Sequence, residues 1–223
     1  MLFIQHELQR TAQNLVADNI KNDEHVLIVS SSDQSKELID AIVSAASSTS
    51  AASVSAIIIA CPEDLKDYKH PAPVIASVKS ADLTIVATTL RFPRAYDDLS
   101  EALFKAGKRQ VLINNAPLED FTRGASLADP IELNRRTHAL AGKISEGKIV
   151  RVKSENGTDL SVKVCRPCIA LTGRAEIDTG FGSFPSGEAM LSPEEFSAEG
   201  IFVADSFGQV VYLNGSGPQL GNL

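Results

Sequence analysis

Four segments in the first half of the chain are apolar along most of their length, without a regular alternation of apolar and polar residues. They are residues 25–29, 53–60, 82–87 and 109–114. Strands that are apolar on both faces need helices on both sides of their sheet, as in parallel α/β proteins. Between them the spacing of apolar residues predicts helices over residues 5–20, 72–80 and 96–106, and another helix that Asp33 could cap.

The last helix of this half has a clear start. Asp129 is expected to be its N-cap, Pro130 its first residue and Glu132 the partner in a capping box, and Gly147 should end it. The pattern therefore predicts a doubly wound, mostly parallel α/β domain of flavodoxin type over residues 1–146.

The composition changes after this helix. Residues 149–154 and 159–164 alternate between apolar and polar side chains, and Asn156-Gly157 between them is a strong hairpin signal. Another hairpin is expected over residues 200–213. We therefore expect a smaller β-rich domain over residues 147–223. A domain of this size buries little surface by itself and should lean on a second copy or another partner.

Several short motifs in this β-rich part occur in a fixed order. They are Thr158-Asp159-Leu160, then Phe184-Pro185-Ser186-Gly187-Glu188, then Pro193 followed by Gly200-Ile201-Phe202-Val203. This ordered set resembles the family of thermophilic metallo-aminopeptidases and their non-peptidase relatives, such as 2,5-dihydroxypyridine dioxygenase.

The resemblance implies a role for Glu188, because in the peptidases the Glu of this loop is the first of several metal ligands. The other ligands, which include two His, come from a longer segment after the loop. All four His of this chain lie before it, and Leu223 is the last residue. The chain is thus expected to be a shortened relative that lacks the C-terminal metal-binding half, with neither a metal nor another cofactor, and not an enzyme.

Charge and composition exclude several classes of function. The formal net charge is −7 with no basic block, so a nucleic-acid partner is not expected. No apolar run approaches the roughly 18 residues of a membrane helix, and no signal peptide precedes the first helix. Three cysteines, an odd number, favour a reducing compartment, so we expect a cytoplasmic protein.

Other candidate motifs have a structural interpretation that is more common than the functional one. Cys165-Arg166-Pro167-Cys168 is a C-x-x-C that does not open a helix, so two thiols beside a strand are expected. The serines of residues 30–35 could hold an anion at a helix N-terminus, but they more often cap it. Ser186 lies outside any G-x-S-x-G elbow, which argues against nucleophilic hydrolysis.

The resulting hypothesis is a non-catalytic scaffold that binds a precursor peptide and presents it to partner enzymes of a ribosomal-peptide biosynthetic pathway. A homodimer is expected. Strand edges left open by the missing half would accept an extended peptide. The alternative is a metal-dependent aminopeptidase- or dioxygenase-like enzyme that a second chain completes. The candidate ligand-binding residues are Arg91, Arg94, Arg174, Phe184, Glu188, Phe202 and Tyr212.

Overall fold

The computed structural model describes residues 2–61, 68–89, 97–114, 117–176 and 179–204. These residues form two compact units, each built from two segments of the chain. The first unit comprises Met1–Leu133 and Thr172–Ser186, and the second comprises Asn134–Leu171 and Gly187–Leu223. The predicted boundary between residues 146 and 147 falls within the first segment of the second unit.

A parallel sheet of five strands forms the centre of the first unit, with the strand order β2-β1-β3-β4-β8. The strands are β1 (His25–Ser31), β2 (Ser53–Ile59), β3 (Leu83–Thr88), β4 (Arg109–Asn114) and β8 (Phe181–Ser183). The first four match the apolar segments of the sequence, which confirms the predicted mostly parallel α/β fold with smaller β sheets after it.

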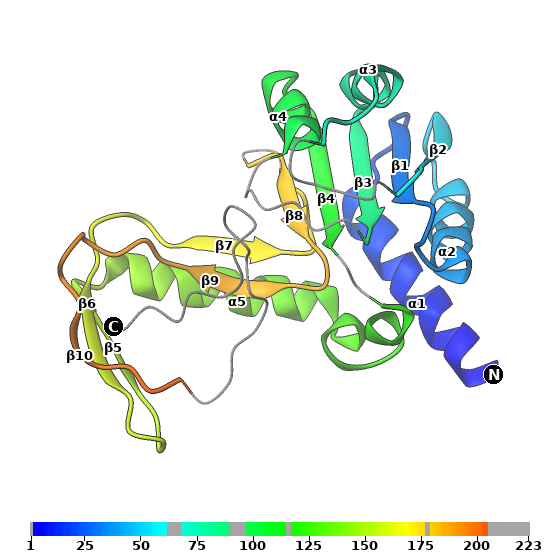
Figure 1. Ribbon diagram of the computed structural model, residues 1–223. Helices are drawn as coiled ribbons and strands as arrows, with labels where there is room; N and C mark the ends of the chain where they lie inside the picture. Colours follow the sequence, from blue (N-terminus) through cyan, green and yellow to red (C-terminus); the bar gives the residue numbers. More distant parts are fainter. Residues whose placement is uncertain (1, 62–67, 90–96, 115–116, 177–178, 205–223) are drawn as a thin grey trace. The chain divides into compact units, whose positions relative to one another are not determined.

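Helices cover both faces of this sheet (Figure 1). Helices α1 (Leu2–Asn19) and α2 (Lys36–Ser47) pack on one face, and α3 (Ala72–Ser80) and α4 (Asp98–Lys105) pack on the other. Alternate residues of each strand enter opposite cores. In β1, for example, Ile28 joins the core under α1 and α2, while Leu27 and Val29 join the core under α3 and α4. This two-sided burial is the physical reason for the continuous apolar runs.

The fifth strand was not predicted. Residues 134–171 belong to the second unit, and the chain then returns to the first. There β8 pairs with β4 in parallel, with Gln110 beside Phe181. Gly182 makes the close fit possible, since a Cβ at this position would lie 2.8 Å from the backbone N of Ala175. The sequence pattern had assigned these residues to the β-rich region after residue 147.

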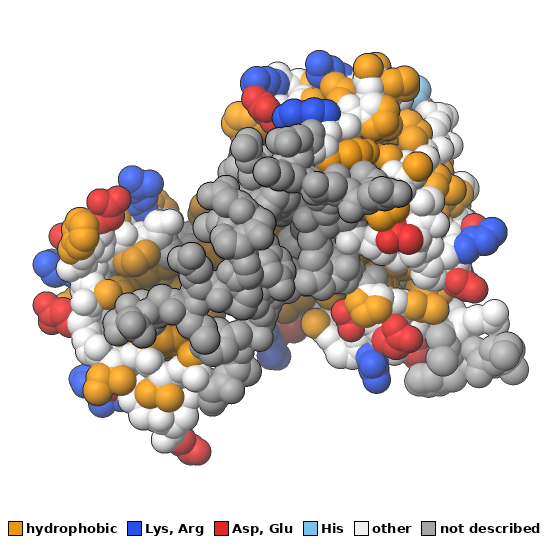
Figure 2. Space-filling view, viewed as in Figure 1, with side chains coloured by type: hydrophobic (Ala, Val, Ile, Leu, Met, Phe, Trp, Pro, Cys, Tyr) orange, Lys and Arg blue, Asp and Glu red, His pale blue; other side chains and the backbone are white. Residues whose placement is uncertain are grey.

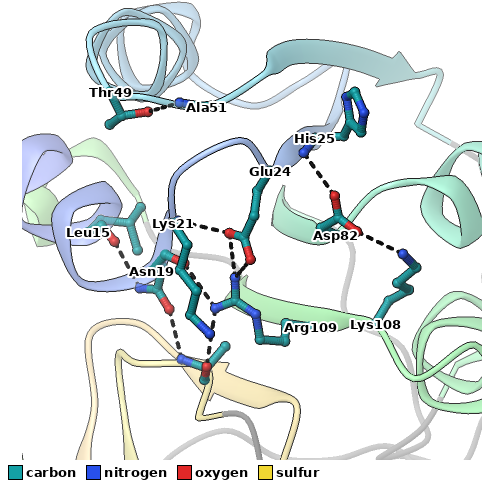
Figure 3. Close-up of polar contacts among 11 residues, drawn as sticks. Leu15, Asn19, Lys21, Glu24, His25, Thr49, Ala51, Asp82, Lys108 and Arg109 are labelled. Carbon is teal, nitrogen blue, oxygen red and sulfur yellow. Dashed lines mark hydrogen bonds and ion pairs between the residues drawn. The ribbon is translucent and has the colours of Figure 1, made fainter.

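A buried polar network holds the returning segment (Figure 3). The amide of Asn19 donates from Nδ2 to the carbonyl of Gly173 at 2.9 Å, and its Oδ1 accepts from the backbone N–H of Ala175 at 2.8 Å. Arg109, at the start of β4, donates from Nη1 to the carbonyl of Asn19 at 2.9 Å and from Nη2 to both carboxylate oxygens of Glu24 at 2.6 Å. The end of α1, the start of β4 and residues 173–175 therefore share one set of hydrogen bonds.

The second unit contains most of helix α5 (Pro130–Glu146) and two small sheets. As predicted, Asp129 caps α5, because its Oδ1 accepts from the N–H groups of Ile131 and Glu132. The strands are β5 (Ile149–Lys153), β6 (Asp159–Lys163), β7 (Ile169–Thr172), β9 (Gly187–Met190) and β10 (Glu199–Ile201).

The larger of these two sheets has the order β10-β6-β5 and is antiparallel, while β7 pairs with β9. The turn at Asn156-Gly157 joins β5 to β6, and Gly157 has a positive φ of 104° as this hairpin signal requires. Gly200 has a φ of 118°, and a Cβ there would lie 2.0 Å from the carbonyl oxygen of Asp159. Two glycines thus allow the backbone geometry of this sheet. The expected strand pair over residues 200–213 falls largely outside the described residues.

We expect Arg109→Met to lower the free energy of unfolding by about 3 kcal/mol, because it leaves the Glu24 carboxylate partly buried without its partner. The measurement is urea denaturation at pH 7. Arg151→Met is the matched control, since Arg151 makes an ion pair of similar length with Asp159 on an exposed surface, where solvent screens it, and its loss should cost much less. Equal losses in the two variants would contradict the assignment of a structural role to the buried network.

Candidate functional site

The carboxyl end of the parallel sheet is the place where this fold offers a crevice. Strand β1 lies between β2 and β3, and the chain leaves β1 toward α2 on one face and leaves β3 toward α4 on the other. In open α/β sheets, ligands bind where neighbouring strands diverge in this way. The side chains that follow β1, β2 and β3 are therefore the candidates for a ligand-binding site.

Four side chains, from the loops after β1, β2 and β3, meet at this point. Ser31 Oγ, at the end of β1, accepts from the backbone N–H of Thr89 at 3.0 Å and lies 3.0 Å from the Thr89 hydroxyl. That hydroxyl donates to Oδ1 of Asp33 at 2.6 Å, and Cys61, which follows β2, lies with its Sγ 3.6 Å from Oδ2 of Asp33. Residues from three different loops thus converge on one carboxylate.

The electrostatics of this cluster favour ligands that donate hydrogen bonds. The hydroxyls of Thr89 and Ser31 lower the pKa of the Asp33 carboxyl, so it carries a negative charge at neutral pH. Desolvation and the adjacent Asp33 charge raise the pKa of the Cys61 thiol, which keeps it protonated. The cluster suits an amine or a hydroxylated group better than an anion. Ser35, for its part, caps α2 by accepting from the N–H of Leu38 at 3.3 Å, so the cap is Ser35 and not Asp33.

A second pair on this end of the sheet joins the starts of α3 and α4. The ring of His70 is buried, and its Nδ1 lies 2.6 Å from Oδ1 of Asp98, while the His70 N–H donates to Oδ2 of Asp98 at 2.9 Å. Burial by itself raises the pKa of the Asp98 carboxyl, but the two hydrogen bonds from His70 outweigh it, and the net shift is downward. Tyr68 packs edge-on against the His70 ring, with 5.2 Å between centroids. Neither this pair nor the Ser31–Thr89 contact was predicted from the sequence. The signal available for Ser31 and Thr89 was a polar residue at or directly after the end of an apolar strand.

The predicted ligand-binding residues do not form one group in the described structure. Arg91, Arg94 and Tyr212 lie outside the described residues. Arg174 is exposed in the first unit, with its Nε 3.6 Å from Glu176. The two described residues in the second unit are Glu188, which is exposed on β9, and Phe202, which is 65% exposed just after β10.

Phe184 occupies a core position. Its ring lies 5.6 Å from the ring of the fully buried Phe121, and it packs against the core under α1 and α2. A Cβ at Gly173 would lie 2.7 Å from the Phe184 ring, so glycine at 173 makes room for it. This placement accounts for Phe184 by packing, and its predicted ligand role stays a prediction.

The second unit presents apolar side chains at its surface (Figure 2). Among its described residues only Thr137, Ala141 and Thr158 are buried. Its exposed large hydrophobic residues are Leu140, Ile149, Val152, Ile169, Met190, Phe196, Ile201 and Phe202. Exposed apolar side chains in this number are unusual on a monomer and indicate a surface of interaction.

The three-stranded sheet of this unit has two unlike faces. On one face Val150 lies opposite Val162 and Val152 lies opposite Leu160, and none of these four side chains is fully buried. On the other face Arg151 donates to both carboxylate oxygens of Asp159 at 2.7 Å, and Lys153 lies 3.1 Å from the same group. These cations lower the pKa of the Asp159 carboxyl to about 2. Asp159 of the Thr-Asp-Leu motif therefore organises the charged face, and Leu160 the apolar one.

Within the described residues, no three His, Cys, Asp or Glu side chains converge in a way that could hold a metal ion. Glu188 thus belongs to no such group among the described residues. None of the three cysteines forms a disulfide, and Cys165 and Cys168 lie between β6 and β7, as the structural interpretation of the C-x-x-C predicts. No helix in the described part of the chain is long and apolar enough to cross a membrane.

These features define a doubly wound α/β protein with an added unit of small sheets. Comparison with known families gives the next step: residues 7–212 match the family described as 2,5-dihydroxypyridine 5,6-dioxygenase. Because the match covers most of the chain, this protein belongs to that family. The resemblance inferred from the ordered motifs is confirmed to this extent.

Two solved structures share the fold. The 2,5-dihydroxypyridine dioxygenase of Pseudomonas putida KT2440 is 19% identical, with a TM-score of 0.64 over 88% of this chain and 58% of its own. Wild-type AmpT of Thermus thermophilus is 14% identical, with a TM-score of 0.59 over 87% of this chain and 63% of its own. The chain therefore spans less than two thirds of the length of each. Comparison with curated proteins gave no significant match.

We expect Thr89→Val to raise the pKa of the Asp33 carboxyl toward its ordinary value, because the strongest hydrogen bond to this carboxylate is lost. Carboxyl-carbon NMR titration measures this directly. Thr49→Val is the control, since the Thr49 hydroxyl donates to Ala46 and not to Asp33. Because the folded pKa is lowered, the hydrogen bond stabilises the fold above the ordinary carboxyl pKa and is lost as pH falls through the folded value. An unchanged Asp33 titration in Thr89→Val would contradict the assigned contact.

Proposed function

We propose that this chain is a non-catalytic scaffold that binds a precursor peptide and presents it to partner enzymes of a biosynthetic pathway. The observation that carries the proposal is the contrast between the two units. The first has two closed cores, whereas in the described part of the second no large apolar side chain is buried and several are exposed. An exposed apolar surface of this extent calls for a partner.

The geometry of the second unit favours an extended peptide as that partner. Strand β5 is at the edge of its sheet and pairs only with β6 among the described strands, so one side of its backbone is open. A peptide strand added there gains main-chain hydrogen bonds, and its alternate side chains reach the apolar face of Val150 and Val152. The other edge strand among the described strands of this sheet is β10, which ends at Ile201; Ile201 and the following Phe202 are 63% and 65% exposed.

Of the predicted ligand residues, Phe202 and Glu188 belong to this unit and are exposed, so they are the first to test. Arg91, Arg94, Arg174, Phe184 and Tyr212 complete the predicted set. A cytoplasmic location accords with three free cysteine thiols.

Phe202→Lys and Val152→Lys should each weaken peptide binding by about tenfold or more, because each replaces exposed apolar contact area with a charge. The probes are heptapeptides blocked at both ends, with Thr alternating with one varied residue, and binding to the full chain is followed by fluorescence anisotropy. Mass spectrometry of the recovered peptides should show them unchanged, as expected of a non-catalytic scaffold.

Phe104→Lys is the matched control, because Phe104 is 79% exposed on α4 in the first unit. It should bind the probes as the wild type does. If no heptapeptide of the panel binds the wild-type chain, or if Phe104→Lys weakens binding as much as Phe202→Lys, the proposal is wrong.

Membership of a family described as a dioxygenase favours one other candidate. In it, the chain would supply Glu188 to a metal site that a second chain completes. The described residues do not make such a site by themselves. The scaffold proposal therefore predicts that the purified chain carries no stoichiometric divalent metal.

Elemental analysis by mass spectrometry tests this with the wild type and Glu188→Gln. One metal per chain in the wild type, lost in Glu188→Gln but kept in Glu199→Gln, would contradict the scaffold proposal and support the metal-dependent enzyme. Glu199 is a fair control because it is also an exposed strand carboxylate of the second unit.

A further inference from the structure

The outer edge of β2 has no pairing strand among the described residues of the first unit. Strand β2 is the end strand of the five-stranded sheet and pairs only with β1 among the described residues. Its sequence, Ser-Val-Ser-Ala-Ile-Ile-Ile, contains no charge and no proline. Soluble proteins usually protect such edges with Lys, Pro, a bulge or a short strand. The other edge strand, β8, has only three residues, so the two ends of the sheet differ.

The backbone of β2 shows which groups point outward. The carbonyl of Ile59 accepts from the N–H of Ser32, which follows β1, so Ile59 directs its backbone groups toward β1. Since these directions alternate along a strand, Ser53, Ser55 and Ile57 also face β1. The outward N–H and C=O groups then belong to Val54, Ala56 and Ile58.

These three residues are placed symmetrically, because Ala56 is the middle residue of the strand. We infer that β2 pairs antiparallel with β2 of a second copy of this chain, about a two-fold axis at Ala56, and joins the two sheets into one. In this register Val54 lies opposite Ile58 of the partner and Ala56 lies opposite itself. The backbone N–H of each outward residue donates to the C=O of its counterpart and the reverse, so both copies contribute the same groups, as in an isologous interface.

The side chains support a second copy as the occupant. Ile58 is 67% exposed, and in this register it covers Val54 of the partner, while the small Ala56 leaves room at the axis. On the opposite face, β2 borders a hollow of about 560 Å³ lined by Ser53, Ser55 and Ile57 together with residues of α3. Ile57 of each copy faces Ser55 of the other and extends the floor of this hollow.

Charge is also compatible with the two-fold arrangement. Helix α2 flanks β2 and has its charged residues, Lys36, Glu37 and Asp40, near its start. Its last exposed positions are serines, Ser44 and Ser47. Antiparallel pairing of the strands sets the charged start of one α2 toward the uncharged end of the other, and the two helix dipoles oppose each other. The charged starts of the two α2 helices therefore lie away from each other in this arrangement.

Sedimentation velocity of the full chain at micromolar concentration tests the inference. The wild type should be a dimer, and Ile58→Lys should raise the dimer dissociation constant by about a hundredfold, since the symmetry counts each substitution twice. Ala56→Pro, which removes only an outward N–H, should act in the same direction. Phe104→Lys, an exposed charge elsewhere in the first unit, should leave the dimer intact.

Amide hydrogen exchange followed by NMR gives a readout specific to this edge. The amides of Val54, Ala56 and Ile58 should be protected in the wild type and exchange rapidly in Ile58→Lys, whereas those of Ser55 and Ile57 stay protected in both. A monomeric wild type, or a dimer that survives Ile58→Lys with the outward amides unprotected, would overturn the inference. Protection of these amides only after a heptapeptide is added to a monomer would also overturn it. The peptide-binding proposal does not depend on the result, because it concerns the second unit.

Discussion

The ion pair of Arg109 with Glu24, together with the amide of Asn19, connects parts of the first unit that are far apart in the chain. Without these hydrogen bonds, residues 173–175 would lose their polar contacts with the end of α1. Strand β8 would then be held mainly by its own pairing with β4. Both charges are largely withdrawn from water, and the guanidinium also bonds to backbone carbonyls. A buried cation with that many acceptors organises the backbone around it and specifies one arrangement.

Much of the first sheet could be predicted because its cause is local. Each of β1 to β4 is a continuous apolar run, and the start of α5 is marked by Asp129, Pro130 and Glu132. The Asn156-Gly157 turn could likewise be predicted from its local sequence. By contrast, the contacts of Asn19 with residues 173 and 175, and of Arg109 with Asn19, join residues 90 to 156 positions apart, and the local sequence gives no signal of them. The strand β8 was missed for the same reason.

The candidate sites divide in the same way. The polar turn after β1 was visible in the sequence, but its partner Thr89 and the His70–Asp98 pair depend on strand order and helix placement. Phe184 was singled out from a motif, and the structure gives it a packing role beside Gly173 and Phe121. Motif residues mix structural and functional requirements, and only their surroundings separate the two.

The path of the chain has a consequence for how the protein is made. The chain leaves the first unit after residue 133, contributes residues 172–186 to it, and leaves again. On a ribosome the first four strands emerge early, but the edge position beside β4 must wait until the hairpin of the second unit has also been synthesised. Any fragment that ends before about residue 186 exposes one side of β4 and its nearby apolar core. During translation the β4 edge of the nascent sheet is therefore unpaired until β8 has been synthesised and has bound beside it.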